Sequence, residues 1–141
     1  MLDLRLLLDT NIVVSAALKH ESLQRTVFLL AITNPARLYV SPPILSEYAE
    51  VLARPELGIR RGARLQLLDL IRNRSVLVKP RIRLKVASDP DDNIFIECAD
   101  AARADYLITG NRRHFPRYWK ATKIISTREF IEIAAPHLLP D

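Results

Sequence analysis

Residues 89–111 read DPDDNIFIECADAARADYLITGN, and the expected architecture of the chain can be worked out from them. The stretch begins with an acidic turn, continues through a segment with apolar residues at helical spacing, and ends in a short apolar strand before Gly110 and Asn111. Polar side chains therefore stand at the start of a helix and at the end of a strand. In a right-handed α/β arrangement these positions meet at one edge of the sheet, where ligands usually bind.

Strands and helices are expected to alternate along the rest of the chain. Short apolar runs predict strands at residues 4–8, 37–40, 75–78, 106–109 and 123–125. Helices are expected at residues 12–18, 21–32, 42–52, 63–72, 93–104 and 127–134. In the fourth helix Leu65, Leu68 and Ile71 should face inward. Residues 81–86 alternate basic and apolar side chains, which favours an extended edge segment. Ser126 and Glu129 are spaced as a capping box. The alternation predicts a parallel sheet with helices on both faces.

The bulk composition is that of one soluble globular domain spanning residues 1–141. Apolar residues make up 49% of the chain, which excludes a disordered protein. The net charge is +5 and 16 of the 21 basic residues are arginine, a bias that suits contact with phosphates but also fits a merely soluble basic surface. The single cysteine, Cys98, fits a reducing compartment. No secretory signal is visible and the longest apolar run is too short to span a bilayer, so a cytoplasmic protein with no membrane association is expected.

Asp9 is the first candidate functional residue, because it ends a predicted buried strand. The alternative is that Asp9 caps the helix that follows it. Thr10 or Asn11 can do that equally well, which would leave the Asp9 carboxylate free.

Asp89, Asp91 and Asp92 form an acidic turn before a helix. Helix capping and the helix dipole favour acids there, by up to ~1 kcal/mol each. Two carboxylates 4 Å apart repel by ~4 kcal/mol at an effective dielectric constant near 20, which exceeds that gain. Either a bound cation offsets the repulsion or the side chains point apart into solvent.

Glu47 and Asn111 are weaker candidates. Glu47 taken alone is an exposed helical glutamate, but its helix begins directly after the second strand and so near the same sheet edge. Asn111 follows a turn at Gly110, and its side-chain carbonyl can accept a metal or a water without adding charge. A purely structural role is the alternative for Asn111.

A loop rich in bases and aromatics follows Asn111. It holds Arg112, Arg113, His114, Phe115, Arg117, Tyr118 and Trp119. This composition is typical of loops that contact phosphates and stack on unpaired bases. The alternatives are that Phe115 belongs to the core and that His114 is an ordinary surface residue.

Together these motifs resemble the PIN-domain family, in particular its VapC-like toxin–antitoxin branch. The resemblance rests on the order and spacing of residues 7–11, Ser46-Glu47 within residues 44–52, residues 89–93, residues 106–111, and residues 124–126 followed by Glu129-Phe130. It covers nearly the whole chain.

The resemblance implies a three-layer α/β/α sandwich with a central parallel sheet of about five strands. It also implies cleavage of single-stranded RNA with Mg²⁺ or Mn²⁺ in an acidic pocket. Carried over by position, Asp9 is the first acid and Glu47 the second, the third is Asp92 or the neighbouring position 93, and Asn111 is the fourth catalytic position. The metal ligands implied are Asp9, Glu47 and Asp92. The neighbouring Asn11, Asp89 and Asn93 line the pocket, and Arg112 and Arg113 hold RNA phosphates.

Two departures from the family pattern keep a second function open. Many members carry Asp where this chain has Asn93 and Asn111. A PIN-like domain that binds RNA or protein without cutting is therefore the alternative to an active ribonuclease. A phosphoacceptor domain of the receiver type fits less well, because no lysine ends a late strand. The resemblance further implies an antitoxin partner and a homodimer, for which residues 23–32 and 63–71 are candidate surfaces.

Overall fold

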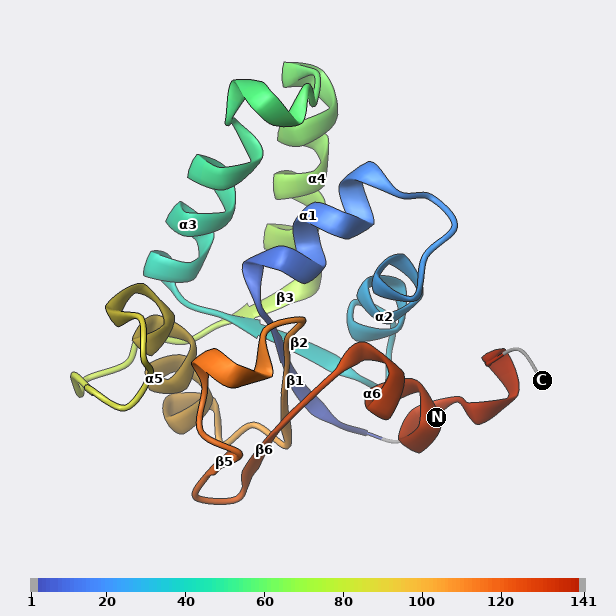
Figure 1. The fold of residues 1–141 in the computed structure, drawn as a ribbon. Helices are drawn as coiled ribbons and strands as arrows, with labels where there is room; N and C mark the ends of the chain where they lie inside the picture. Colours follow the sequence, from blue (N-terminus) through green and yellow to red (C-terminus); the bar gives the residue numbers. More distant parts are fainter. Residues whose placement is uncertain (1–2, 140–141) are drawn as a thin grey trace.

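A six-stranded sheet forms the centre of the computed structural model, which describes residues 3–139 (Figure 1). The strands are β1 (Arg5–Leu8), β2 (Arg37–Val40), β3 (Ser75–Leu77), β4 (Tyr106–Ile108), β5 (Tyr118–Trp119) and β6 (Thr122–Ile125), in the order β3-β2-β1-β4-β6-β5. Five strands run parallel, and β5 is antiparallel to β6. The five parallel strands are the five predicted from the sequence.

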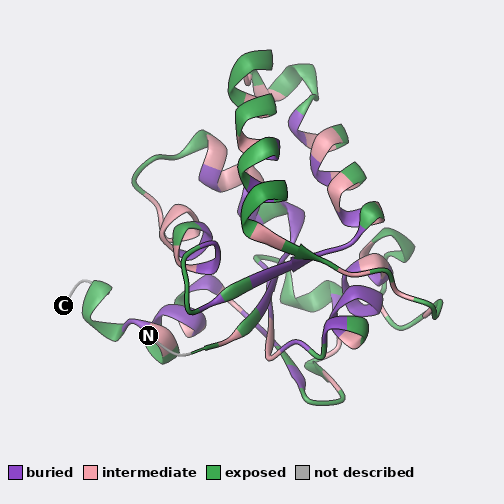
Figure 2. Ribbon diagram, turned by 180° about the vertical axis from the view of Figure 1, so that it is seen from behind, coloured by how far each residue is buried: buried purple, intermediate pink, exposed green. Residues whose placement is uncertain are grey.

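The central strands are buried because helices cover the sheet. Leu6, Leu7 and Leu8 of β1 are fully buried (Figure 2). Strands covered on both faces have no solvated side and therefore read as continuous apolar runs. This is why β1 carries three leucines in succession instead of an alternating pattern.

The helices form the outer layers of the predicted α/β/α sandwich. They are α1 (Thr10–Leu18), α2 (Leu23–Ala31), α3 (Pro42–Leu52), α4 (Arg61–Arg74), α5 (Asn93–Ala102) and α6 (Thr127–Ala134), with short 3-10 turns η1 (Pro55–Leu57), η2 (Pro90–Asp92), η3 (Arg112–His114) and η4 (Pro136–Leu138). Helix α5 packs against β1, β2 and β4, whereas α2 packs against α1 and α6. Ser126 caps α6 in the capping box predicted with Glu129.

The expected edge segment at residues 81–86 is not a strand. Its backbone N–H groups are bound by side chains of α5 instead of by a neighbouring strand. Glu97 accepts from Leu84 at 2.9 Å, and the side-chain oxygen of Asn93 accepts from Val86 and Ala87. The prediction of sheet pairing from the alternating pattern was wrong, because side chains of a helix can accept the hydrogen bonds of an extended segment's N–H groups.

Two other expectations need correction. Leu65 is 42% exposed, and only Leu68 and Ile71 of α4 are buried, because the first turns of this helix extend beyond the sheet (Figure 2). The end of the basic-aromatic loop forms β5, a strand too short to show a period in the sequence.

The order of the strands fixes where a site can form. Strand β1 lies between β2 and β4. The chain adds β2 and β3 on one side of β1 and then crosses over to add β4 on the other side of β1. The carboxyl ends of β1 and β4 therefore flank a topological switch point, the usual ligand position of open parallel sheets. Tyr48 of α3, which is fully buried, donates its hydroxyl to the Leu8 carbonyl and fixes α3 beside this point. Across residues 3–139, no helix is long and apolar enough to cross a membrane.

Tyr48→Phe tests how strongly α3 is held. Removing the hydroxyl leaves the buried Leu8 carbonyl without that donor, and we expect the free energy of unfolding to fall by about 1–2 kcal/mol. Urea denaturation measures the change. Tyr118→Phe is the matched control, since that side chain is 66% exposed. Equal stability of the two variants would contradict a structural role for the Tyr48 hydroxyl.

Candidate active site

Asp9 lies at the centre of the switch point. Its backbone N–H donates to Ile108 at the end of β4, and its side chain begins α1 as the N-cap. The alternative capping residues, Thr10 and Asn11, lie inside the helix, so the expectation that they would leave Asp9 free is wrong. Asp9 Oδ1 accepts from the Thr10 N–H and Oδ2 accepts from the Thr109 hydroxyl, both at 2.7 Å. The carboxylate is thus fixed between β1 and β4 with only 4% of the residue exposed.

Glu47 is connected to Asp9 through one residue. The Thr10 hydroxyl donates to Glu47 Oε2 at 2.6 Å, while the Thr10 N–H donates to Asp9. Tyr48, the next residue of α3, is held at Leu8. Glu47 therefore lies at the site because α3 is fixed there, which its position in the sequence alone does not reveal.

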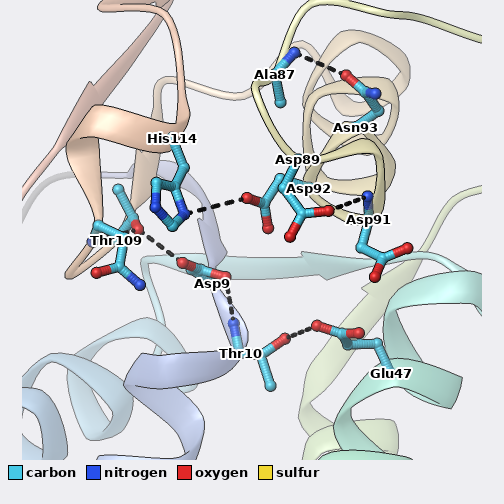
Figure 3. Close-up of polar contacts among 11 residues, drawn as sticks. Asp9, Thr10, Glu47, Ala87, Asp89, Asp91, Asp92, Asn93, Thr109 and His114 are labelled. Atoms are coloured by element: carbon cyan, nitrogen blue, oxygen red, sulfur yellow. Dashed lines mark hydrogen bonds and ion pairs between the residues drawn. The ribbon is translucent and has the colours of Figure 1, made fainter.

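The three acids of η2 have three different environments (Figure 3). Asp89 accepts from the Asp91 N–H at 3.0 Å and caps the turn. Asp91 is exposed and points away from Asp9. The side chain of Asp92 is 16% exposed and faces the space above Asp9. Of the two positions considered for the third acid, Asp92 and not residue 93 therefore faces the site.

Burial and like charges disfavour ionisation in this cluster. Burial raises the pKa of Asp9, although the hydrogen bonds from Thr109 and Thr10 oppose the shift. Burial, with the carboxylates of Asp9, Asp89 and Glu47, raises the pKa of Asp92 to about 6. Asp92 is therefore close enough to Asp9, Asp89 and Glu47 for their negative charges to disfavour its ionisation.

His114 lies beside Asp92 at the site, although the sequence alone gave it little weight. Its Nδ1 lies 3.7 Å from Asp92 Oδ2, and a positive charge on the ring opposes the burial that raises the pKa of Asp9 and Asp92. The His114 N–H donates to the Asn111 carbonyl and its own carbonyl accepts from Ser88, so two loops hold the residue. Its place in the sequence, at the end of η3 and six residues after Ile108, gave no local signal of this contact.

The three asparagines of the site have different environments. The Asn93 side-chain oxygen accepts from two backbone N–H groups and points toward Ala87, away from Asp9 (Figure 3). Asn11 is exposed on α1. Asn111 is also exposed, and its N–H donates to the Thr109 hydroxyl at 2.9 Å. That bond connects the turn after β4 to Asp9 through Thr109.

The donor set has the chemistry of a Mg²⁺ or Mn²⁺ site but is not assembled into one. Within residues 3–139, no three acidic, histidine or cysteine side chains are close enough to hold a metal ion together. The expected convergence of Asp9, Glu47 and Asp92 on one coordination point is therefore not formed in this arrangement. All three offer carboxylate oxygens, which these ions prefer, and Mg²⁺ is commonly bound by one or two carboxylates with the remaining positions filled by water.

A family model described as PIN domain matches residues 5–113. The chain belongs to the PIN-domain family. PIN domains are generally metal-dependent nucleases that use divalent ions.

A solved structure shares the fold. It is a chain of the crystal structure of VapBC2 from Rickettsia felis bound to a promoter DNA fragment, with a TM-score of 0.59 and 18% sequence identity. The match covers 86% of this PIN domain and 98% of that chain. No match was found among curated proteins.

The two arginines expected to contact RNA differ in this PIN domain. Arg112 pairs with Glu129 at 2.6 Å, so its charge is already partly neutralised. Arg113 has no ion-pair partner within residues 3–139. Both line a hollow of about 480 Å³ beside Asn111 and His114.

The raised pKa of Asp92 predicts a dependence of stability on pH. Because the carboxyl has a pKa of 3.8 when exposed and about 6 in the folded protein, the folded state binds more protons between these values and stability falls as pH rises through them. Asp92→Asn should therefore raise the free energy of unfolding by roughly 1 kcal/mol at pH 7.5, solvent screening included, and change it little below pH ~4. Urea titrations at both pH values measure this. A stabilisation that does not depend on pH would contradict the electrostatic cause.

Proposed function

We propose that this protein is a metal-dependent endoribonuclease that cuts single-stranded RNA and acts as the toxin of a toxin–antitoxin pair. The observation that carries the proposal is geometric: Thr10 donates to both Asp9 and Glu47, and Asp92 faces Asp9 from η2, so carboxylates of three separate segments lie at the switch point. Repelling carboxylates gathered at a switch point suit a cation-binding role.

The proposed metal ligands are Asp9, Glu47 and Asp92, with Mg²⁺ or Mn²⁺ as the ion. When bound, such an ion lowers the pKa of a water molecule and stabilises the charge that develops on a phosphodiester. Asn111 is the fourth catalytic position, and Asn11, Asp89 and Asn93 are the neighbouring pocket residues. Asp89 and Asn93 already serve turn and loop contacts, so we assign them positioning roles.

The threonines set the orientation of the proposed ligands. Thr109 and Thr10 each donate to Asp9, and Thr10 also donates to Glu47. These bonds hold both carboxylates toward the switch point and occupy only part of their acceptor capacity, since a carboxylate offers about four lone-pair sites. His114, beside Asp92, supplies a titratable group for proton transfer at the same edge.

Single-stranded RNA suits the site because Asp9 is recessed, and an unpaired backbone can enter without a second strand in the way. The basic residues after β4, among them Arg112 and Arg113, favour a polyanion. The likeness to a chain of a VapBC2 structure is in line with an antitoxin partner. The homodimer is proposed from the family resemblance alone. A toxin of this kind acts on cytoplasmic RNA.

Asp9→Asn tests the nuclease activity. With Mn²⁺ or Mg²⁺ the intact protein should cleave labelled single-stranded RNA, and the variant should be slower by about 100-fold or more because a metal ligand and its charge are lost. Asp69→Asn is the matched control, since it removes the same charge from the exposed surface of α4. Cleavage by Asp9→Asn equal to that of the intact protein would rule out the proposed mechanism.

The second candidate function is an RNA-binding module that does not cut. It is favoured by Asn111 at the fourth position and by the lack of an assembled three-ligand set within residues 3–139. The same assay separates the two functions: retention of RNA without cleavage at any metal concentration would support the module.

Metal binding should also stabilise the fold. Mg²⁺ or Mn²⁺ at a concentration 100 times its Kd adds about 2.7 kcal/mol by mass action, which raises the melting temperature by several degrees. Asp92→Asn should lose most of this shift, whereas Asp69→Asn should keep it. Thermal denaturation with and without EDTA measures the effect, and equal shifts in both variants would place the ion elsewhere.

A further inference from the structure

The positive charge of the chain is concentrated in one segment. Residues 106–128 hold six of the 21 Arg and Lys residues and none of the 16 Asp and Glu residues, so fifteen basic and sixteen acidic residues are left elsewhere. This basic segment runs from β4 through η3 and β5 to the start of α6. Its η3 turn follows the carboxyl end of β4, beside the acidic switch point, whereas β5 pairs with the first residues of β6 at the opposite edge of the sheet (Figure 1). The net charge of +5 is therefore a property of this segment.

The structure separates the cations of the basic segment into two groups. Arg112, Lys120 and Arg128 are paired with Glu129, Asp100 and Glu132. Arg113, Arg117 and Lys123 have no carboxylate partner in the described part of the chain. Only the second group is free to neutralise a ligand.

The aromatic residues of the segment are also divided. Phe115 is buried in the core, and the Trp119 indole N–H donates to Asp100 at 3.0 Å. Tyr118 lies opposite Lys123 in the hairpin, so it projects from the other face of β5 than its neighbours Arg117 and Trp119. Among the described residues, the face that carries Arg117 therefore offers no free aromatic side chain for stacking. The planar guanidinium of Arg117 can itself stack on a base.

Two hollows along the segment meet at the arginines. The first, about 480 Å³, is lined by residues 109–114 and Ser126 and opens beside Asn111 and His114. The second, about 290 Å³, is lined by Arg112, Arg113, Phe115, Pro116, Arg117 and Ile124. Arg112 and Arg113 border both hollows. Arg112 is paired with Glu129, whereas Arg113 has no carboxylate partner within residues 3–139. Arg117 lines the second hollow, and its backbone is fixed there because its carbonyl accepts from the Ile124 N–H at 3.0 Å.

We propose that the second hollow is a nucleotide subsite for single-stranded RNA, adjacent to the acidic pocket. Arg113 contacts the phosphate that joins the two hollows. Arg117 packs its guanidinium plane against a base that lies over Phe115, Pro116 and Ile124. The proposal rests on the proposed function and extends it, because it fixes the path of the strand as it leaves the acidic site. A paired duplex does not fit, since its bases are stacked on one another and are not free to enter.

The test is RNA binding by the full chain in EDTA, so that no cleavage occurs. The probe is a fluorescein-labelled ten-nucleotide oligouridylate, followed by fluorescence anisotropy over a series of salt concentrations. Arg113→Gln should weaken binding about fivefold and reduce the slope of log K against log salt by about 0.7, the value for one phosphate contact with a single strand. Arg117→Lys keeps the charge but loses the planar group, and should weaken binding about fivefold with the slope unchanged.

Arg60→Gln is the matched control, because it removes one positive charge from an exposed position before α4. It should bind within about twofold of the unaltered protein, since it lies outside the contacted phosphates. A duplex of the same length should bind equally well to Arg117→Lys and to the unaltered protein. The melting temperature of each variant verifies that it is folded.

Two results would overturn the subsite. One is an Arg113→Gln variant with the affinity and slope of Arg60→Gln, and the other is an absence of oligouridylate binding by the unaltered protein. The nuclease proposal fails separately, when the protein with Mn²⁺ cuts RNA no better than Asp9→Asn. Loss of binding in the arginine variants without any cleavage would support the subsite and reject the nuclease.

Discussion

The buried carboxylate of Asp9 is the constraint on which the rest of the site depends. It ends β1 inside the fold, and such a group is tolerated only when donors surround it. Thr10 and Thr109 supply those donors, and they do so by joining the beginning of α1 to the end of β4. The same threonines extend the contacts to Glu47 and to the turn at Asn111. One buried charge thus connects four segments that are far apart in the sequence.

A second set of contacts holds the opposite side of the pocket. Asn93 and Glu97, one turn apart on α5, bind the backbone of residues 84–87. Ser88 then donates to the carbonyl of His114. Asp92 and His114 are therefore positioned by one irregular segment. The departure from the family pattern at Asn93 has a structural explanation: an amide oxygen accepts two N–H groups there without adding another negative charge beside Asp92.

The acidic groups and the first arginines of the basic segment, Arg112 and Arg113, lie near one another at the carboxyl edge of the sheet. The acids come from β1, α3 and η2, whereas residues 106–128 contain no acid at all. A cluster of carboxylates repels a phosphate backbone, so a nuclease needs both a cation in the acidic pocket and fixed positive charge beside it. Arg113 and Arg117, which have no carboxylate partner within residues 3–139, lie within a few residues of His114. This arrangement gives the proposed activity a physical basis beyond the family likeness.

The sequence by itself determined the five parallel strands and indicated which acids to propose for the site. Apolar runs such as Leu6–Leu8 and the capping box at Ser126 depend on local interactions, so they could be predicted with their boundaries nearly correct. The tertiary structure alone decided which polar groups face the site. Nothing local distinguishes Asp92 from Asp91, or Arg113 from Arg112, because the difference lies in partners brought from distant elements, Asp9 in one case and Glu129 in the other. The same reason applies to residues 81–86. Their alternating side chains indicate an extended backbone, but whether its N–H groups bind a neighbouring strand or a helix is decided only when α5 packs against the sheet.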